Sequence, residues 1–385
     1  MSDVPVEIGR PCPAWREGEL VIHFIQTGCG EQSFFIMPDG TTMLLDCGDQ
    51  YRPQYLMHVP RRPTSERLGG EWVSRYVQRL ISERTIDYFV LTHWHGDHCG
   101  KPGMRSELAA DGRRVCGITR FAEDFGIRNY FDHQYPRSGV YALSPDFDSL
   151  EMMREWIPFM AEKRGMKPHA FEVGARDQIR MLRGGHGKYP FSIRNLHANC
   201  VYWDGKDGTV DYAPEYIGSH PASKGAIAEN ALSLGIRVDY GSFSAYFGGD
   251  IDSPEYEDRL AQVIGEVQAC KMNHHGCHTS MGSELCRRLK ARLYFSSVWS
   301  PNQVAERGLV NMSSRELYQG ERFICPGYFP EVKRQAYAGR KFIDDFPPVQ
   351  GHLVIRVDPG GKSWGFSILT TEDESMRVLF HKEVV

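Results

Sequence analysis

The strongest constraint on the fold is a short run of metal-binding side chains directly after a buried strand. Residues 86–91 form an apolar run that predicts a buried β-strand, and residues 92–98 follow with the sequence THWHGDH. Imidazole nitrogens and carboxylate oxygens are common zinc ligands, and a loop that leaves a strand end can bring alternate side chains together. The pattern therefore predicts a metal site at a sheet edge. The side chains that would build it are His93, His95, Asp97 and His98.

The rest of the chain alternates strands and helices as an α/β protein does. Short β-rich runs separated by turn residues lead to Asp46 in the first half and to Asp250 in the second. In each half a helix and a further strand follow, and that strand ends directly before histidines. We therefore expect two sheets with helices outside. The expected strands are 20–26, 33–37, 41–45, 86–91, 191–196, 231–238, 242–247, 267–272, 292–298, 351–357 and 363–369, and the expected helices are 71–83, 254–265 and 283–290.

Two segments differ in character from this core. Residues 101–189 are rich in aromatic, charged and glycine residues, and we interpret them as an insertion over the core with helices at 149–163 and 177–182. Residues 300–350 predict an irregular elaboration near the C-terminus. The whole of 1–385 is expected to form a single domain with these additions.

Composition excludes several classes of protein. No apolar run is long enough for a membrane-spanning helix, and the N-terminus lacks the apolar centre of a secretory signal, so we expect a cytoplasmic protein without a membrane partner. The 10 cysteines form no C-x-x-C pair and are expected to be reduced. A net charge of −4 gives no general attraction to nucleic acid, so such binding would need a local basic patch. Residues 287–292 (RRLKAR) offer one, although a solvated helix face explains them as well.

The H-x-H-x-D-H run resembles the signature of the metallo-β-lactamase-fold hydrolases. That resemblance implies a four-layer αββα sandwich of the metallo-β-lactamase type with metals at the sheet edges. The order of Asp46, Asp250 and the His274-His275-Gly276 run also agrees with the family pattern. Within the superfamily, residues 20–100 and 190–300 are similar to the soluble domain of ComEC-type competence proteins, through PDG at 38–40, NALS at 230–233, GD at 249–250 and HHG at 274–276.

The resemblance implies two zinc ions, and manganese or iron would use much the same ligands. One ion would be held by His93, His95 and a third histidine, and the other by Asp97, His98 and a late histidine, with Asp250 between them. For the late histidine we favour His275 over His274, because a glycine follows it as in the family. The third histidine is open among five: His133, His169, His186, His197 and His220. His197 is favoured because it ends the strand 191–196.

The same resemblance implies a hydrolase in which a hydroxide shared by the two metals attacks the substrate. Phosphodiesters, either nucleic acid or a small nucleotide, are the expected substrates. Asp46 would orient a ligand imidazole. The candidates for assisting the leaving group are Asn230, Ser233, His274 and His278, which lie close to the motifs. Carboxylic ester, lactone or thioester hydrolysis by the same site is the alternative, and a metal-binding regulatory module without turnover is a second one. The oligomeric state is not indicated.

Overall fold

The computed structural model describes residues 5–50, 59–103, 106–133, 142–143, 147–185, 187–220, 224–300 and 303–384. The strands of a first sheet are β1 (Leu20–Phe24), β2 (Ser33–Ile36), β3 (Thr42–Leu45), β4 (Thr85–Leu91), β7 (Gly126–Asp132), β9 (Lys167–Ala170), β19 (His352–Val357), β20 (Trp364–Leu369) and β21 (Val378–Val384). They lie in the order β21-β20-β19-β1-β2-β3-β4-β7-β9. The N-terminal and C-terminal parts of the chain thus share one sheet.

A second sheet is formed by the middle of the chain. Its strands are β10 (Phe191–Ala198), β11 (Val201–Trp203), β12 (Thr209–Asp211), β14 (Gly235–Tyr240), β15 (Phe243–Phe247), β16 (Ala269–Lys271), β17 (Leu293–Phe295) and β18 (Phe323–Cys325). They lie in the order β12-β11-β10-β14-β15-β16-β17-β18. Two small ribbons pair β5 (Glu107–Leu108) with β6 (Arg114–Val115) and β8 (Ala142–Leu143) with β13 (Ile227–Ala228).

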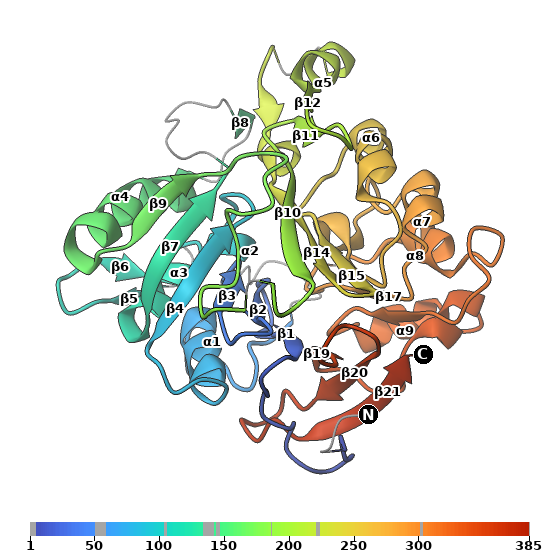
Figure 1. Ribbon diagram of the computed structural model, residues 1–385, viewed down its shortest axis with the longest axis horizontal. Coiled ribbons are helices and arrows are strands. Elements are labelled where there is room, and N and C mark those ends of the chain that lie inside the picture. The colour runs from blue at the N-terminus through green and yellow to red at the C-terminus, as the bar shows by residue number, and fades with distance from the viewer. Residues whose placement is uncertain are drawn as a thin grey trace.

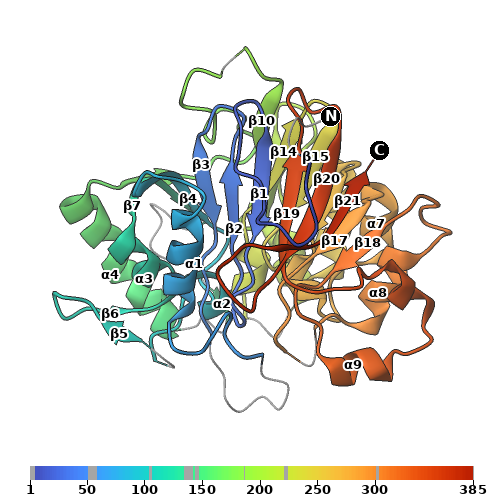
Figure 2. The ribbon, with the colours of Figure 1, turned by 90° about the horizontal axis from the view of Figure 1, so that it is seen from below.

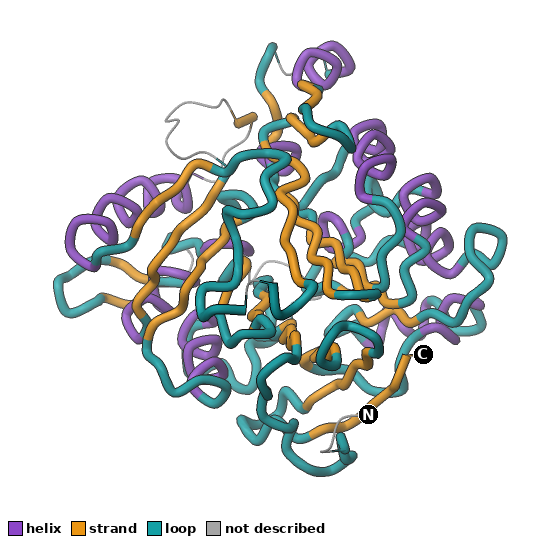
Figure 3. The backbone as a smooth tube through the Cα atoms, viewed as in Figure 1, coloured by secondary structure: helices purple, strands orange, loops and turns teal. Residues whose placement is uncertain are grey.

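Helices cover the outer faces of the two sheets (Figures 1, 2 and 3). The helices are α1 (Gly69–Gln78), α2 (Gly96–Cys99), α3 (Gly117–Asp124), α4 (Phe147–Arg164), α5 (Ala213–Ser219), α6 (Pro254–Ile264), α7 (Ser283–Leu289), α8 (Glu306–Ser313) and α9 (Glu331–Ala336). Helices α1, α3 and α4 lie beside the first sheet, and α6, α7 and α8 lie beside the second. None of the helices in the described ranges combines the length and apolar character that a membrane crossing needs.

Three apolar cores hold these layers together. The core between the sheets joins Ile22 and Val90 of the first sheet to Ile236 of the second, and the rings of Phe35 and Phe247 meet edge to face with centroids 5.0 Å apart. A second core lies between the first sheet and α1, α3 and α4, and a third between the second sheet and α6, α7 and α8. The four-layer αββα sandwich expected from the sequence is confirmed.

The segment 101–189 contributes to the first sheet as well as lying beside it. Its strands β7 and β9 extend that sheet beyond β4, with parallel pairing. The helix expected at 177–182 is wrong, because those described residues form no helix. Ile179 and Met181 are both buried in the core between the sheets, and this alternation of two is that of an extended segment. In 300–350, β18 joins the second sheet and α8 and α9 pack outside it, so this region has regular structure too.

Strand direction places the functional loops at one edge. Strand β3 pairs in parallel with β4, and β15 pairs in parallel with β16. The carboxyl ends of parallel neighbours meet at the same edge of a sheet. The loops that begin at Asp46, His93, Asp250 and Asn273 therefore emerge close together, from two sheets that face each other.

The free energy of unfolding is expected to depend on pH through two buried histidines, His23 and His352. Burial lowers the pKa of His352 from 6.5 to about 3, and burial together with Arg356 and His352 lowers that of His23 to about 3. Both rings are neutral in the folded protein but become protonated below pH 6.5 in the unfolded chain. The free energy of unfolding is therefore unaffected by these rings above pH 6.5 and decreases as the pH falls towards 3. Each contributes a slope of about 1.4 kcal/mol per pH unit in that range. Urea unfolding of His352→Gln between pH 7 and 4 is expected to show a shallower loss than the wild type, and an unchanged slope would contradict this.

Candidate metal centre

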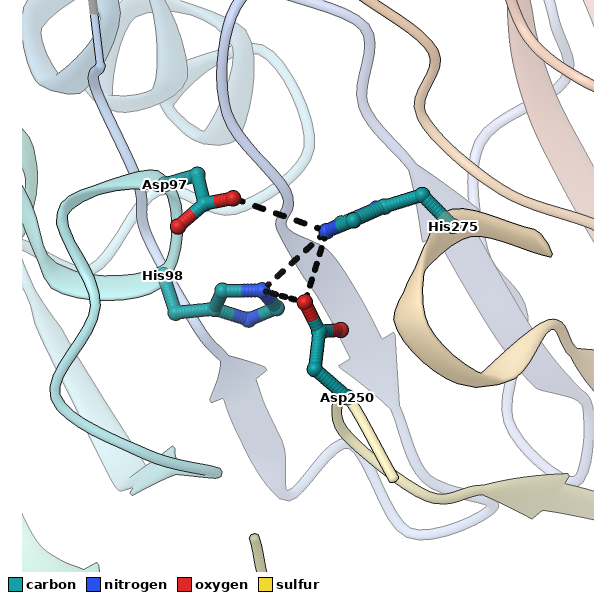
Figure 4. A group of neighbouring side chains, drawn as sticks. All are labelled: Asp97, His98, Asp250 and His275. Carbon is teal, nitrogen blue, oxygen red and sulfur yellow. Dashed lines mark hydrogen bonds and ion pairs between the residues drawn. The ribbon is translucent and has the colours of Figure 1, made fainter. Parts of the chain in front are cut away.

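Four side chains from both halves of the chain converge at this edge (Figure 4). Asp97 and His98 come from the loop and short helix after β4, Asp250 follows β15, and His275 follows β16. Oδ2 of Asp250 lies 3.2 Å from Nε2 of His98 and 3.0 Å from Nε2 of His275. Oδ2 of Asp97 lies 3.6 Å from the same Nε2 of His275. One ligand atom from each of the four residues lies within 4.8 Å of the other three.

Asp46 fixes the orientation of His98. Its Oδ2 lies 2.8 Å from Nδ1 of His98, so Nε2 of that ring is the nitrogen that faces Asp250. The backbone N–H and the hydroxyl of Thr92 also donate to the Asp46 carboxylate, at 2.7 and 2.9 Å. Asp46 has a φ of 58°, a conformation that non-glycine residues adopt at a cost. The following loop packs so tightly that a Cβ on Gly48 would lie 1.6 Å from the carbonyl oxygen of Asp97.

Glu31 and Lys271 form a second layer beneath the four side chains. Oε2 of Glu31 lies 3.1 Å from Nδ1 of His275, which leaves Nε2 of that ring to face Asp250. Nζ of Lys271 lies 2.9 Å from Oε1 of Glu31 and 3.1 Å from Oδ1 of Asp250, and it donates to the carbonyl oxygen of Gly249 at 2.7 Å. Both side chains are buried. Neither residue was predicted from the sequence, although a lysine inside an apolar strand that leads to the histidines was an available signal.

The histidine loop after β16 is strained and held from below. His274 and His275 are consecutive residues in the left-handed region, with φ of 43° and 51°. Glu257 on α6 is buried, and its carboxylate accepts hydrogen bonds from Nδ2 of Asn273 at 2.9 Å and from the N–H groups of Met281 and Gly282 at 2.9 and 2.7 Å. This buried clamp ties both ends of the loop to one helix and so supports the conformation that turns His275 inward.

His274 points to the rim of the same site. Its Nε2 lies 3.4 Å from Nδ2 of Asn230, and its Nδ1 lies 3.9 Å from Oδ2 of Asp252. Nδ2 of Asn230 donates to the same Asp252 oxygen at 2.9 Å. The side chain of His274 is 26% exposed, whereas that of His275 is 1% exposed. The two neighbouring histidines therefore occupy different places, one at the rim and one inside.

His93 and His95 lie beside the four side chains. Nε2 of His93 lies 3.1 Å from Nδ1 of His95, and the rings of His93 and His98 have centroids 4.2 Å apart. Burial and the neighbouring His98 lower the pKa of His93 well below its ordinary value, so this ring is neutral and keeps a lone pair for a ligand. A neutral imidazole is the form that binds a metal.

A buried pair, His133 and Glu229, lies near His93 and His95. Nε2 of His133 lies 3.0 Å from Oε1 of Glu229, which also accepts a hydrogen bond from the N–H of Trp94 at 2.8 Å. Burial opposes the charge of Glu229, but His133 outweighs it and lowers the pKa to about 2, with a contribution from His95. Within the described part of the chain, neither ring nitrogen of His133 has a hydrogen bond of good geometry. The sequence offered His133 as one of five choices and gave no signal for Glu229.

The structure does not bring His197 to this group. Nδ1 of His197 donates to the carbonyl oxygen of Ser233 at 3.0 Å, and its Nε2 lies 3.0 Å from the hydroxyl of Tyr246. Two other candidates also have partners elsewhere: Nε2 of His169 lies 3.0 Å from Oδ1 of Asn129, and Nδ1 of His220 lies 2.9 Å from the carbonyl oxygen of Tyr216. His186 lies outside the described residues. Strand position was therefore a poor guide, because β10 turns His197 into the core of the second sheet.

The charges of the centre are strongly coupled. Burial opposes the protonated form of His98, but Asp250 and Asp46 outweigh it and raise its pKa to about 10. Burial likewise opposes ionisation of Asp250, but His275, His98 and Lys271 outweigh it and hold the pKa of this carboxyl well below its ordinary value. Carboxylates that attract protons onto neighbouring rings attract a divalent cation to the same place. A cation binding here would release those protons.

Residues 27–101, which contain the H-x-H-x-D-H loop and Asp46, match the model of the metallo-beta-lactamase superfamily. Within residues 27–101 the chain is therefore similar to the metallo-beta-lactamase superfamily. Proteins of this superfamily bind divalent metals such as zinc and iron and are mostly hydrolases. The four side chains of Figure 4 are candidate metal ligands, and Asp97 and His98 lie within the matched residues.

Solved structures with a similar arrangement include proteins of different activity. Zn²⁺-bound PqqB from Methylobacterium extorquens is 10% identical with a TM-score of 0.37, over 87% of this chain and 99% of that one. The diiron β-hydroxylase CmlA from Streptomyces venezuelae is 12% identical with a TM-score of 0.32, over 80% of this chain and 49% of that one. The short form of human tRNase Z is 11% identical with a TM-score of 0.30, over 78% and 89%. No curated protein matches the sequence.

Three of the four cations in the basic run at 287–292 have acidic partners. Arg287 and Arg288 both pair with Glu284, at 2.6 and 2.5 Å, and Lys290 pairs with Glu266. These side chains lie on or just after α7 and are partly exposed. Paired surface cations attract a polyanion less than free ones do.

Proposed function

We propose that the protein is a divalent-metal-dependent hydrolase of phosphodiesters of nucleotide size. The observation that carries the proposal is the position of Asp250, whose Oδ2 lies 3.2 Å from Nε2 of His98 and 3.0 Å from Nε2 of His275. A carboxylate oxygen and two imidazole nitrogens that face one another inside a buried group are a typical donor set for zinc, manganese or iron. The layer beneath, Asp46 and Glu31, fixes which nitrogen each ring presents.

The donor set fits a divalent cation. Asp97, His98, Asp250 and His275 would hold one ion, and His93 and His95 would hold a second with a further ligand from His133 or Glu229. When bound, the two ions would activate water and neutralise charge on the substrate. The protein's own contribution is to orient the ligands and to keep His93 neutral.

His274 is the candidate for assisting the leaving group. An alkoxide that leaves from phosphorus, like one that leaves from a carboxylic ester, needs a proton, and a histidine near a carboxylate at the rim of a metal centre can deliver it. Its Nδ1 lies 3.9 Å from Asp252, and Asn230 contacts the same carboxylate. Asn230 would position the ring and His274 would protonate the leaving group.

The likeness of residues 230–233, 249–250 and 274–276 to the ComEC-type domain supports phosphodiesters, and closeness to that group is part of the proposal. We favour a small nucleotide over nucleic acid because three of the four cations of residues 287–292 are paired with Glu284 and Glu266. A long polyanion gains most from unpaired cations along its path.

A substrate panel tests this function. Purified protein loaded with zinc or manganese is assayed with bis(p-nitrophenyl) phosphate, a cyclic dinucleotide, single-stranded DNA, a lactone and a thioester. We expect cleavage of the two small phosphodiesters. A chelator is expected to abolish this cleavage, and added metal is expected to restore it. Cleavage of the lactone or thioester alone would overturn the phosphodiester assignment, and metal binding without turnover of any substrate would favour a regulatory module. Faster cleavage of DNA than of the small diesters would overturn the proposed substrate size.

The ligands of the second ion are tested by metal content. His133→Ala is expected to lower the bound metal from about two ions to about one, because it removes a buried imidazole beside His93 and His95. His197→Ala is the matched control, since that ring contacts Ser233 and Tyr246 instead, and it is expected to keep both ions. Plasma emission spectroscopy after dialysis measures the ratio. Loss of metal from the His197 variant and not from the His133 variant would reverse the assignment.

A further inference from the structure

Lys271 is a buried cation in contact with a candidate metal ligand, and the metal-binding role proposed above does not use it. Its side chain is 2% exposed, and Nζ lies 3.1 Å from Oδ1 of Asp250 and 2.9 Å from Oε1 of Glu31. Nζ also donates to the carbonyl oxygen of Gly249 at 2.7 Å. An ammonium group has three protons to donate, and these three acceptors match them.

The two oxygens of Asp250 therefore have different surroundings. Oδ1 is held by Lys271, whereas Oδ2 faces Nε2 of His98 and Nε2 of His275. A buried charge pair this close is costly to break, so the carboxylate is not free to rotate and offer Oδ1 to the same place as Oδ2. Through Oε1 of Glu31, the same ammonium also holds the carboxylate that orients His275.

We propose that Lys271 is a positioning residue that reserves one oxygen of Asp250 for the metal and keeps the other out of the coordination shell. The inference rests on the metal centre proposed above. It adds that Asp250 coordinates the metal through one carboxylate oxygen and not through both. A centre with fewer protein ligands keeps positions open for water and substrate. Lys271 also supplies positive charge among Glu31, Asp46 and Asp250 before any metal binds.

Cobalt spectroscopy tests the proposal without relying on activity. Co²⁺ in a four-coordinate site absorbs visible light more strongly than in a six-coordinate one, so the intensity reports the number of ligands. Lys271→Met keeps the length of the side chain and removes the charge, which frees Oδ1 of Asp250 to join the metal. The visible absorption per bound cobalt is expected to fall by about twofold or more. Lys333→Met is the control, a mostly buried lysine whose Nζ donates to the carbonyl of Gln303, and it is expected to keep the wild-type spectrum.

A second variant separates the two roles of the Glu31–Lys271 pair. Glu31→Gln weakens the hold on Nδ1 of His275 but leaves Lys271 beside Asp250. It is expected to weaken cobalt binding by about 10- to 100-fold while the absorption per bound cobalt stays unchanged. An unchanged spectrum in Lys271→Met would overturn the inference alone, whereas failure of the wild-type protein to bind cobalt would overturn the metal centre itself.

A wild-type crystal structure with bound metal covers the case in which Lys271→Met does not fold. Coordination by Oδ2 alone, with Lys271 still on Oδ1, is the expected arrangement. Coordination of one ion by both oxygens of Asp250 would overturn the proposal.

Discussion

Asp250→Asn is expected to abolish metal binding at the centre and to lower kcat/KM on bis(p-nitrophenyl) phosphate by more than about 100-fold. The variant keeps the shape of the side chain but removes the negative charge that faces Nε2 of both His98 and His275. It also removes one of the two carboxylates that neutralise the buried ammonium group of Lys271, so that only Glu31 remains. Metal content and phosphodiesterase kinetics on the same preparation measure the effect.

The matched control for this variant is Asp258→Asn. Asp258 lies on α6 and is exposed, eight residues after Asp250. It is expected to retain metal and activity. A full metal complement together with full activity in Asp250→Asn would contradict the central position that we give to this carboxylate.

Glu257→Ala is expected to destabilise the protein by about 3 kcal/mol, because it leaves three buried N–H donors without their acceptor. Those donors belong to Asn273, Met281 and Gly282, at the two ends of the loop that carries His275. The loop contains two residues in the strained left-handed conformation, so its conformation is unfavourable once these hydrogen bonds are lost. We expect Tm to fall by roughly 4 °C and the affinity for metal to fall with it.

Glu255→Ala on the same helix is the control for the clamp. Glu255 is exposed in the first turn of α6, so its removal is expected to change Tm by only a small amount. Thermal unfolding with and without zinc separates the two effects. Equal Tm values for the Glu257 and Glu255 variants would show that the three hydrogen bonds do not stabilise the loop.

Much of the architecture was predictable because it depends on local pattern. The strands around Asp46 and Asp250 and the helix that became α6 were placed to within a few residues, because apolar alternation and turn residues bound them. The segment around Ile179 was predicted as a helix and is extended. Ile179 and Met181, two residues apart, both pack into the core between the two sheets, and that core exists only once the sheets have come together. Local pattern does not reveal which surface a segment will meet.

The candidate ligands show the same division. Asp97, His98, Asp250 and His275 were named from the sequence and lie together, because each lies in a segment that follows a strand and parallel strands end at a common edge. His197 was named for the same reason and lies elsewhere, because the face to which a strand residue points depends on register with its neighbours. His133 ends a strand that joins the first sheet beside β4, a pairing that the sequence did not indicate.

The sequence by itself determined that this chain alternates strands and helices and carries a dense set of metal-binding side chains after one buried strand. Only the tertiary structure decided that Glu31 and Lys271 stand behind His275 and Asp250, because Glu31 reaches His275 across 244 positions of the chain and Lys271 meets Glu31 and Asp250 inside the site. Contacts of that kind arise from the packing of two sheets face to face. No periodicity along the chain encodes them.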